Sequence, residues 1–298
     1  MNFEHALSLL QSGDIIGLPT ETVYGLAGDA TNKNAIAKIY ALKGRPSFNP
    51  LIIHGYGVEQ LLEFAYFTPD ALILAEHFWP GPLTLVLKRK EHCPIDLLAS
   101  GGLETIAVRI PRHSIAQELL RQFKKPLAAP SANISNSLSP TSKAMVIKDF
   151  PNLYVLEGGE CPVGLESTII SCVASPTLLR PGGIAREDIE ARIGKLANPE
   201  EGKILAPGMM KKHYAPKTPL RLNATEKLEG EVLLGFGNIE NADLNLSVKG
   251  DLTQAAANLF SMLHALDKRG VNKIAVSPIP EHYLGLAIND RLRRAVAG

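Results

Sequence analysis

Short apolar runs alternate with stretches of helical periodicity through the first two thirds of the chain. The runs have the length of buried strands and lie at Ile15–Leu18, Leu51–His54, Leu83–Leu87, Thr105–Ile110, Leu127–Ala129, Thr168–Ser171 and Thr177–Leu179. Apolar residues that recur every three or four positions predict helices at Asn34–Leu42, Val58–Phe64, Asp70–Phe78, Ser114–Phe123, Ser142–Lys148 and Arg186–Ile193. The spacing of Phe3, Ala6, Leu7 and Leu10 predicts a further short amphipathic helix, and Thr31 or Asn32 can cap the helix that follows. This mixture predicts an α/β or α+β domain with a twisted sheet.

The pattern fails between Leu196 and Pro219, where Asn-Pro, Pro-Gly, Ala-Pro and Thr-Pro pairs punctuate a polar stretch. A second alternation follows, with strands at Val232–Phe236 and Lys273–Ser277 and helices at Gln254–Lys268 and Leu284–Ala297. We therefore predict a first domain over residues 1–197, a linker over 198–219 and a small α/β domain over 220–298.

Bulk properties narrow the class of protein. The 31 basic and 30 acidic side chains give a formal net charge of +1, so non-specific attraction to nucleic acid is not expected to be the main activity, although a local basic patch stays open. The three cysteines form no CxxC pair, which argues against a disulfide framework or a thiolate zinc site. The N-terminus lacks the basic segment of a signal peptide, and no apolar run reaches the length of a membrane span. These features predict a soluble, cytoplasmic protein without a membrane contact.

Polar clusters follow several of the predicted strands. In open α/β sheets ligands gather outside strand ends, so the clusters could converge on one cleft. The first is Pro19–Leu26, with threonine hydroxyls and a carboxylate, and the second is Lys43–Pro50, in which a glycine and two prolines hold two cations in a stiff loop. A capped turn explains the first about as well as a ligand site does. A solvated basic helix end is the usual explanation of the second, although a fixed cationic loop suits a polyphosphate better.

Of two further clusters, one carries a single cation and the other carries many hydroxyl groups. Alternation places Arg109 on the face of its strand opposite Ile106, Val108 and Ile110, where it needs either a protein carboxylate or a ligand carboxylate. A structural ion pair is the more usual answer. The segment Ala129–Thr141 offers hydroxyls and backbone N–H groups that could bind an anion or merely cap a helix.

Several familiar catalytic motifs are missing from the sequence. It contains no GxxxxGK[ST] loop and no convincing GxGxxG, so a nucleotide would not be held by a P-loop or a dinucleotide-binding fold. It also lacks GxSxG and HExxH, and its histidines do not cluster at metal-ligand spacing. Neither a covalent nucleophile nor a protein metal centre is therefore predicted.

Taken in order, the motifs resemble those of the YrdC-type threonylcarbamoyl-AMP synthases. They are PTETVYGL (19–26), KGRPSFNPLIIH (43–54), WPGPLTLVL (79–87), VRIPRH (108–113), APSANIS (129–135) with SPT (139–141), VGLESTII (163–170) and LRPGG (179–183). Two later segments, APGMMKKHYAP (206–216) and GLAINDRLRRA (285–295), resemble the two-domain branch of that family. Asn136 departs from the pattern, because a glycine is common at this place, and Ser171 stands where an aspartate is common.

The resemblance implies the fold and the site. The fold would be a twisted-sheet catalytic domain, a linker and a small Rossmann-like α/β domain. The L-threonine site would comprise Thr22, His54, Arg109, the Ala129 backbone and Ser167, with Arg109 on the threonine carboxylate. The ATP site would comprise Lys43, Arg45, Asn49, Thr105, Ser131, Asn133, Ser139, Arg180 and Tyr214. Lys43 and Arg45 would be catalytic, and the linker that carries Tyr214 would close over the cavity as a lid.

The resemblance also implies the reaction. Threonine and bicarbonate form a carbamate that attacks the α-phosphorus of ATP, which gives threonylcarbamoyl-AMP and pyrophosphate. Mg²⁺ would arrive with ATP and be held mainly by its phosphates, and neither Glu21 nor Glu166, the nearby carboxylates, is assigned as a ligand. A tRNA threonylcarbamoyl transferase would consume the product, and a weak contact with tRNA stays open. Two alternatives remain: a non-enzymatic RNA-binding module, and an enzyme that adenylates another carbamate, as related domains of hydrogenase maturation do.

Overall fold

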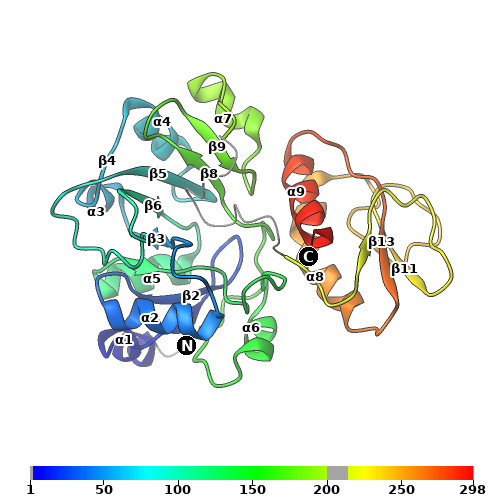
Figure 1. The fold of residues 1–298 in the computed structure, drawn as a ribbon, viewed down its shortest axis with the longest axis horizontal. Coiled ribbons are helices and arrows are strands. Elements are labelled where there is room, and N and C mark those ends of the chain that lie inside the picture. The colour runs from blue at the N-terminus through cyan, green and yellow to red at the C-terminus, as the bar shows by residue number, and fades with distance from the viewer. Residues whose placement is uncertain (1–2, 200–213, 298) are drawn as a thin grey trace.

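The computed structural model describes residues 3–199 and 214–297, which form two sheets with helices around them (Figure 1). The larger sheet has nine strands and the smaller has four. The mixed α/β architecture predicted from the sequence is confirmed. Most of the predicted linker, residues 200–213, lies outside the described residues.

The larger domain contains the first nine strands and seven helices of the described chain. Its strands are β1 (Ile16–Leu18), β2 (Gly25–Asp29), β3 (Ile52–His54), β4 (Ala65–Tyr66), β5 (Leu83–Arg89), β6 (Thr105–Arg109), β7 (Leu127–Ala128), β8 (Thr168–Ser171) and β9 (Thr177–Arg180). Its helices are α1 (Phe3–Gln11), α2 (Lys33–Lys43), α3 (Val58–Leu62), α4 (Pro69–Phe78), α5 (Ser114–Phe123), α6 (Lys143–Asp149) and α7 (Arg186–Ile193). The smaller domain adds β10 (Leu220–Arg221), β11 (Glu231–Gly235), β12 (Leu244–Asn245), β13 (Lys273–Val276), α8 (Leu252–Asp267) and α9 (Leu284–Val296).

The strand order of the larger sheet brings separate segments of the chain to one edge. The order is β1-β2-β7-β3-β6-β5-β8-β9, with β4 paired to β5. Strands β3 and β6 are parallel, and so are β5 and β8, while the other neighbours run antiparallel. The carboxyl ends of β3 and β6 therefore lie near the start of β8 and the end of β9.

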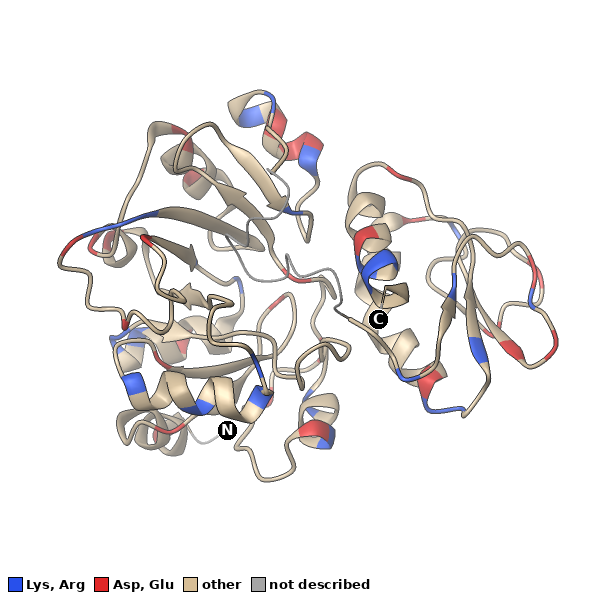
Figure 2. Cartoon of the chain, in the orientation of Figure 1, with Lys and Arg blue, Asp and Glu red and all other residues tan. Residues whose placement is uncertain are grey.

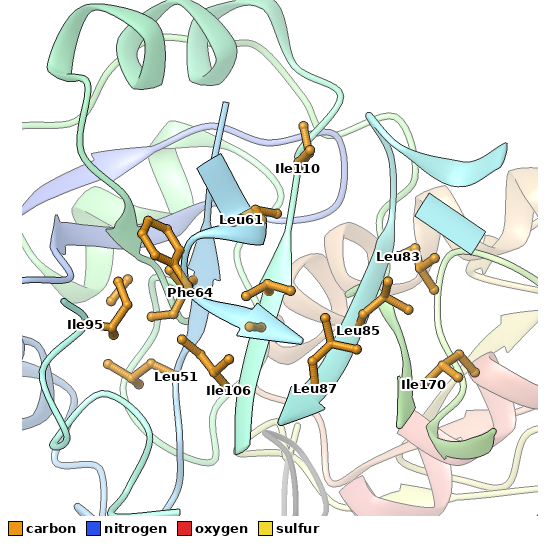
Figure 3. Close-up of a cluster of buried hydrophobic side chains, with 14 of the residues drawn as sticks. Leu51, Leu61, Phe64, Leu83, Leu85, Leu87, Ile95, Ile106, Ile110 and Ile170 are labelled. Atoms are coloured by element: carbon orange, nitrogen blue, oxygen red, sulfur yellow. The ribbon is translucent and has the colours of Figure 1, made fainter. Parts of the chain in front are cut away.

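The core explains why these runs form strands. On β5, Leu83, Leu85 and Leu87 point into the large hydrophobic cluster, and the intervening Val86 belongs to a smaller cluster on the other face (Figure 3). Ile106 and Val108 on β6 and Ile110, which follows it, point into the large cluster and Ala107 into the smaller one, as the alternation predicted. Helices α2, α4 and α7 contribute to the large cluster, while α1 and α5 pack together in another one.

The sequence prediction missed β2, β4, β10 and β12. Strand β2 reads Gly-Leu-Ala-Gly-Asp, which has low strand propensity, and it forms because β1 and β7 pair with it on both sides. The other three strands have two residues each, too few to show any periodicity. Asn32 caps α2, since its side chain accepts from the N–H groups of Asn34 and Ala35. Asn136 adopts a left-handed backbone with φ of 72°, which accounts for the glycine that is common at this place.

The smaller sheet is parallel throughout, in the order β10-β13-β11-β12. Helix α9 lies on the side of the smaller domain that faces the larger one (Figure 1). The two domains share a hydrophobic cluster, because Val23, Leu138 and Leu165 of the larger domain pack with Leu259 and Phe260 of α8. The smaller domain is thus joined to the larger one by an apolar contact.

Acidic and basic residues are interspersed over both domains (Figure 2). This distribution matches the near-neutral charge of the whole chain. In the described part of the chain, no helix has both the length and the apolar composition that a bilayer crossing requires.

The two domains are packed closely against each other at Gly164. A Cβ at this position would lie 2.5 Å from both the Cα and the carbonyl oxygen of Ala257 on α8, and the backbone φ is +70°. Gly270 has a similar φ of +66° but nothing within 4 Å. Gly270→Ala should therefore lower the free energy of unfolding by about 1–2 kcal/mol through backbone strain alone. Gly164→Ala should lower it by roughly 1–3 kcal/mol more because of overpacking. Urea denaturation of both variants measures the difference, and equal losses would contradict close packing at Gly164.

Candidate active site

Several strand ends of the larger sheet surround one cavity. Its lining comes from the β1–β2 turn, the ends of β3, β6, β7 and β9, the segment before β8, the α2–β3 loop and Tyr214. The lining residues are Thr20, Thr22, Val23, Gly25, Arg45, Ile52, His54, Arg109, Ala129, Pro130, Ser131, Glu166, Ser167, Arg180 and Tyr214. The sequence predicted that polar clusters after strands would converge, and the structure brings most of them together here.

The β1–β2 turn is fixed by its own hydroxyl groups. The Thr20 hydroxyl accepts from the N–H of Val23 and lies 2.8 Å from the hydroxyl of Thr22. Close approach of Ala129 leaves little room beside Gly25, where a Cβ would lie 3.1 Å from the Ala129 Cβ. The turn is therefore a rigid wall of the cavity.

Arg109 has a protein carboxylate as its partner. Its Nη2 lies 2.8 Å from Oε1 of Glu21, and both side chains are at most 4% exposed. Its Nη1 donates to the Thr22 hydroxyl at 3.0 Å, and its Nε donates to the Gly81 carbonyl at 3.2 Å. The structural ion pair that the sequence offered as one explanation for Arg109 is therefore present. Its partner is Glu21, which the sequence did not identify as the partner. A guanidinium carries five N–H donors, so these three contacts leave N–H groups of Arg109 that can donate into the cavity.

His54 lies beside Arg109, because β3 and β6 pair with these two residues in register. Burial lowers the pKa of the His54 imidazole to about 3, and the Arg109 charge acts in the same direction. The ring nitrogen Nδ1 lies 3.2 Å from the Ile52 carbonyl. At neutral pH His54 is therefore uncharged and offers a polar contact without adding positive charge.

Lys43 is the last residue of α2 and is buried under the loop of residues 131–133. Its Nζ donates to the carbonyl oxygens of Ser131 and Asn133, the latter at 2.6 Å. Burial lowers the pKa of this amine well below its ordinary value, and the nearby Arg45 adds to the effect. In the structure Lys43 fixes the serine-containing loop and does not line the cavity.

Arg45 and Arg180 face the cavity while carbonyl groups hold their guanidinium groups. Arg45 donates through Nε to the Asn49 carbonyl and through Nη2 to the Pro50 carbonyl, at 3.1 and 2.9 Å. Arg180 donates through Nη2 to the Ser167 carbonyl at 2.9 Å. Burial lowers the pKa of Arg45 to about 10, which leaves it charged at neutral pH. The backbone carbonyl acceptors of both guanidinium groups are neutral, and the charge of Arg180 also acts on Glu166.

Glu166 is the acidic residue among those that line the cavity. Burial alone would raise the pKa of its carboxyl, but Arg291, Arg180 and the Ser139 hydroxyl outweigh burial and lower it to about 2. Nε of Arg291 lies 2.9 Å from Oε2 of Glu166, and the Ser139 hydroxyl donates to Oε1. Glu166 is therefore ionised and held from outside the cavity.

Tyr214 reaches the cavity from the chain between the domains. It is buried, and its ring lies 5.8 Å from Phe260 and 5.0 Å from the guanidinium carbon of Arg291. Its backbone φ of 63° is uncommon for a bulky residue. The smaller domain thus positions an aromatic side chain at the cavity.

The structure places all the predicted site residues except Thr105 in two groups. Those that line the cavity are Thr22, Arg45, His54, Arg109, Ala129, Ser131, Ser167, Arg180 and Tyr214. Lys43, Asn49, Asn133 and Ser139 are buried behind it, where they hold loops or Glu166. Thr105 lies at the opposite end of β6 from Arg109, four residue steps or roughly 13 Å along the strand, and does not line the cavity. Its contact with ATP stays a prediction.

Six other residues that line the cavity were not assigned to the threonine site or the ATP site from the sequence: Thr20, Val23, Gly25, Ile52, Pro130 and Glu166. Each is adjacent in sequence to a residue that was predicted or belongs to the same motif. Proximity to the predicted clusters was therefore a usable signal. Arg291 lies in the motif GLAINDRLRRA (285–295), but it is one of several basic residues there and was not singled out.

Two family models together match almost the whole chain. The model for Sua5, YciO and YrdC proteins, described as "Telomere recombination", matches residues 8–182. The model described as "Threonylcarbamoyl-AMP synthase, C-terminal domain" matches residues 184–297 and so includes α7, which packs on α4 of the larger domain. The domain boundaries at 197 and 219 remain predictions.

Curated relatives and a solved structure resemble the chain over nearly its full length. The threonylcarbamoyl-AMP synthase of Pyrococcus abyssi is 41% identical over 317 residues, which cover 97% of this chain and 92% of that protein. The one from Bacillus subtilis is 38% identical and covers 98% and 92%. The crystal structure of P. abyssi Sua5 complexed with L-threonine superposes with a TM-score of 0.90 at 38% identity and covers 99% and 94%.

The lowered pKa of His54 predicts a pH dependence of stability. The folded-state pKa is about 3 and the ordinary value is 6.5, so below pH 6.5 the unfolded chain binds a proton that the folded chain does not. This contribution to stability is fully present above pH 6.5 and is lost by about 1.4 kcal/mol per pH unit as the pH falls toward 3. Denaturant unfolding at pH 7.5 and 5.5 should show the loss in the wild type, with a smaller loss in His54→Asn. Equal losses in both proteins would contradict a neutral buried His54.

Proposed function

The chain belongs to the family of threonylcarbamoyl-AMP synthases, and we propose that its cavity holds L-threonine beside the phosphates of ATP. The observation that carries the proposal is the meeting of Arg45, Arg109 and Arg180 with several hydroxyl groups in one cavity. Such a cavity suits two anionic groups at once, a carboxylate and a polyphosphate.

The enzyme makes threonylcarbamoyl-AMP for the modification of tRNA. In the proposed sequence, the threonine amine adds to the carbon of bicarbonate and water leaves, which gives a carbamate. A carbamate oxygen then attacks the α-phosphorus of ATP, and pyrophosphate leaves. Transfer of the adenylyl group makes the enzyme a nucleotidyltransferase. We propose that it works in the cytoplasm and passes the product to a tRNA threonylcarbamoyl transferase.

The threonine site is proposed on the side of the cavity at β3 and β6. Arg109 would bind the threonine carboxylate with the N–H groups that its contacts to Glu21, Thr22 and Gly81 leave over. The uncharged His54 and the Thr22 hydroxyl can accept or donate hydrogen bonds to the amino acid. Ser167, which hydrogen-bonds to Thr84 at 2.7 Å, and the Ala129 backbone complete this side.

The nucleotide site is proposed on the side of Arg45, Ser131 and Arg180. Carbonyl acceptors hold both arginines, so little reorganisation is needed when phosphates arrive. Lys43 would act indirectly, because its amine fixes the carbonyl groups of the loop that presents Ser131. Tyr214 would cover the nucleotide as part of a lid, a role proposed here from its burial at the cavity.

Mg²⁺ would enter with ATP and be held mainly by the phosphates. The carboxylates near the cavity are engaged elsewhere, Glu166 with Arg291 and Glu21 with Arg109. Among residues 3–199 and 214–297, no three His, Cys, Asp or Glu side chains form a group that could hold a metal ion. When bound, the ion would offset charge on the pyrophosphate leaving group.

No covalent intermediate on the protein is needed for this chemistry. Alignment of a carbamate oxygen with the α-phosphorus can itself contribute about 7–11 kcal/mol in favourable cases. The buried arginines then stabilise the charge that develops on the phosphorus centre. Positioning and electrostatics together account for the lack of a nucleophile motif in the sequence.

The first test is the substrate requirement. Purified protein with Mg²⁺ and ATP should release pyrophosphate when both threonine and bicarbonate are present, and far less when either is omitted. In an assay that contains a mixture of amino acids, omission of each one in turn shows which amino acid forms the carbamate that is adenylated. Turnover with carbamoyl phosphate in place of threonine and bicarbonate would contradict the proposal, and so would RNA binding without any turnover.

Arg109→Ala should raise the threonine concentration needed for half-maximal rate far more than the ATP concentration. Loss of a hydrogen bond to a charged group corresponds to about 1.5–3 kcal/mol, so we expect roughly a 10- to 150-fold increase for threonine. Initial rates of pyrophosphate release, with each substrate varied in turn, measure both values. Arg112→Ala is the matched control, because Arg112 is exposed and lies three residues further along the chain. A larger effect on ATP than on threonine would refute the assignment of Arg109.

A further inference from the structure

Arg291 belongs to the smaller domain but makes its contacts at the cavity of the larger one. Its side chain is 1% exposed, and its Nε lies 2.9 Å from Oε2 of Glu166. Its Nη1 donates to the Pro181 carbonyl at 2.8 Å and to Asp290 at 2.7 Å. Its guanidinium carbon lies 5.0 Å from the centre of the Tyr214 ring. A single side chain of α9 therefore contacts both Glu166 and Tyr214, which line the cavity, and the residue that follows Arg180.

Glu166 presents an electrostatic problem for a cavity that must accept an anion. Its carboxylate is ionised at neutral pH, since its pKa is lowered to about 2. An uncompensated buried carboxylate would repel incoming phosphates, and its field would be weakly screened in a water-poor site. It would also draw a cavity arginine toward itself. A counter-charge placed outside the cavity avoids both effects.

Arg291 meets this requirement by its position. It approaches Oε2 of Glu166 from α9, while the Ser139 hydroxyl binds Oε1. Both carboxylate oxygens are thus engaged by groups that do not line the cavity. Arg45 and Arg180 meanwhile donate to backbone carbonyl groups, which are neutral, while the charge of Arg180 also acts on Glu166.

We propose that Arg291 is a positioning residue for nucleotide binding: it neutralises Glu166 from the smaller domain, so that the cavity stays net positive toward a triphosphate. The proposal rests on the proposed function for the identity of the anion. The competing explanation is that the ion pair of Arg291 and Glu166 only joins the two domains. The two explanations predict different results for removal of the acid and removal of the base.

The test measures binding of an unreactive ATP analogue with Mg²⁺ by titration calorimetry, with the full-length protein and three variants. Charge compensation predicts that Arg291→Gln weakens binding by about tenfold or more, because Glu166 is left uncompensated. Glu166→Gln should bind within about threefold of the wild type or more tightly, since a repulsive charge has gone. The double variant Glu166→Gln/Arg291→Gln should also bind within about threefold of the wild type.

A role in joining the domains predicts that all three variants weaken binding alike, and this result would overturn the proposal. Unchanged binding by Arg291→Gln would overturn it too. Arg293→Gln is the matched control on the same helix, because Arg293 is 53% exposed and pairs with Glu281 on the surface. It should bind like the wild type.

Circular dichroism melts establish that each variant is folded. If Arg291→Gln does not fold, the other two variants still decide, because charge compensation predicts that both bind and domain joining predicts that both fail. Calorimetry needs no turnover, so the test is separate from that of the proposed function. If the wild type binds the analogue but releases no pyrophosphate with threonine and bicarbonate, the proposed function is contradicted and the charge-compensation proposal is not. A wild type that does not bind the analogue would overturn the charge-compensation proposal.

Discussion

Buried positive charge at one edge of the larger sheet is the constraint that the rest of the structure meets. Arg45, Arg109 and Arg180 all line a single cavity. Removing an ion from water costs several kcal/mol even after relaxation, and like charges add to that cost. Arg109 is compensated by Glu21, while Arg45 and Arg180 are held by carbonyl dipoles. The cavity therefore keeps positive charge that a bound anion would offset.

The sheet supplies the rigidity that this arrangement requires. Parallel pairing of β3 and β6 fixes His54 beside Arg109, and pairing of β8 with β9 fixes Arg180 beside Ser167. The intervening loops are short or closed by hydroxyls, as in the turn held by Thr20. Groups on regular elements are held more accurately than groups on long loops, which matters because catalysis by positioning tolerates little displacement.

The sequence was sufficient for elements with strong periodicity. The bounds of α5, α7 and β8 were predicted to the residue. Helix α5 has regular apolar spacing, whereas α7 has Glu187 and Asp188 in its first turn and is followed by Gly194, and β8 is a short apolar run. Strand β2 was missed because its glycine-rich sequence carries no strand signal and its pairing depends on distant neighbours. For Arg109 the alternation fixed the face of the strand but left two partners open, and the tertiary fold selected Glu21. Lys43 was predicted to contact the nucleotide, and that role stays a prediction, because the structure shows only that its amine lies beneath the loop that carries Ser131. The sequence next to Arg109 and Lys43 does not reveal which distant groups these two side chains contact in the fold.

The smaller domain is best understood as part of the site. Tyr214 keeps an uncommon left-handed backbone, which costs about 1–2 kcal/mol for a bulky residue. Contacts with Phe260 and Arg291 of the smaller domain can offset that cost. Val23, which lines the cavity, and Leu165, which precedes Glu166, pack in the same hydrophobic cluster as α8. Loss of the smaller domain would expose these apolar residues and leave Glu166 without its counter-ion. Docking of the smaller domain and formation of the cavity are therefore energetically coupled, because the same side chains serve both.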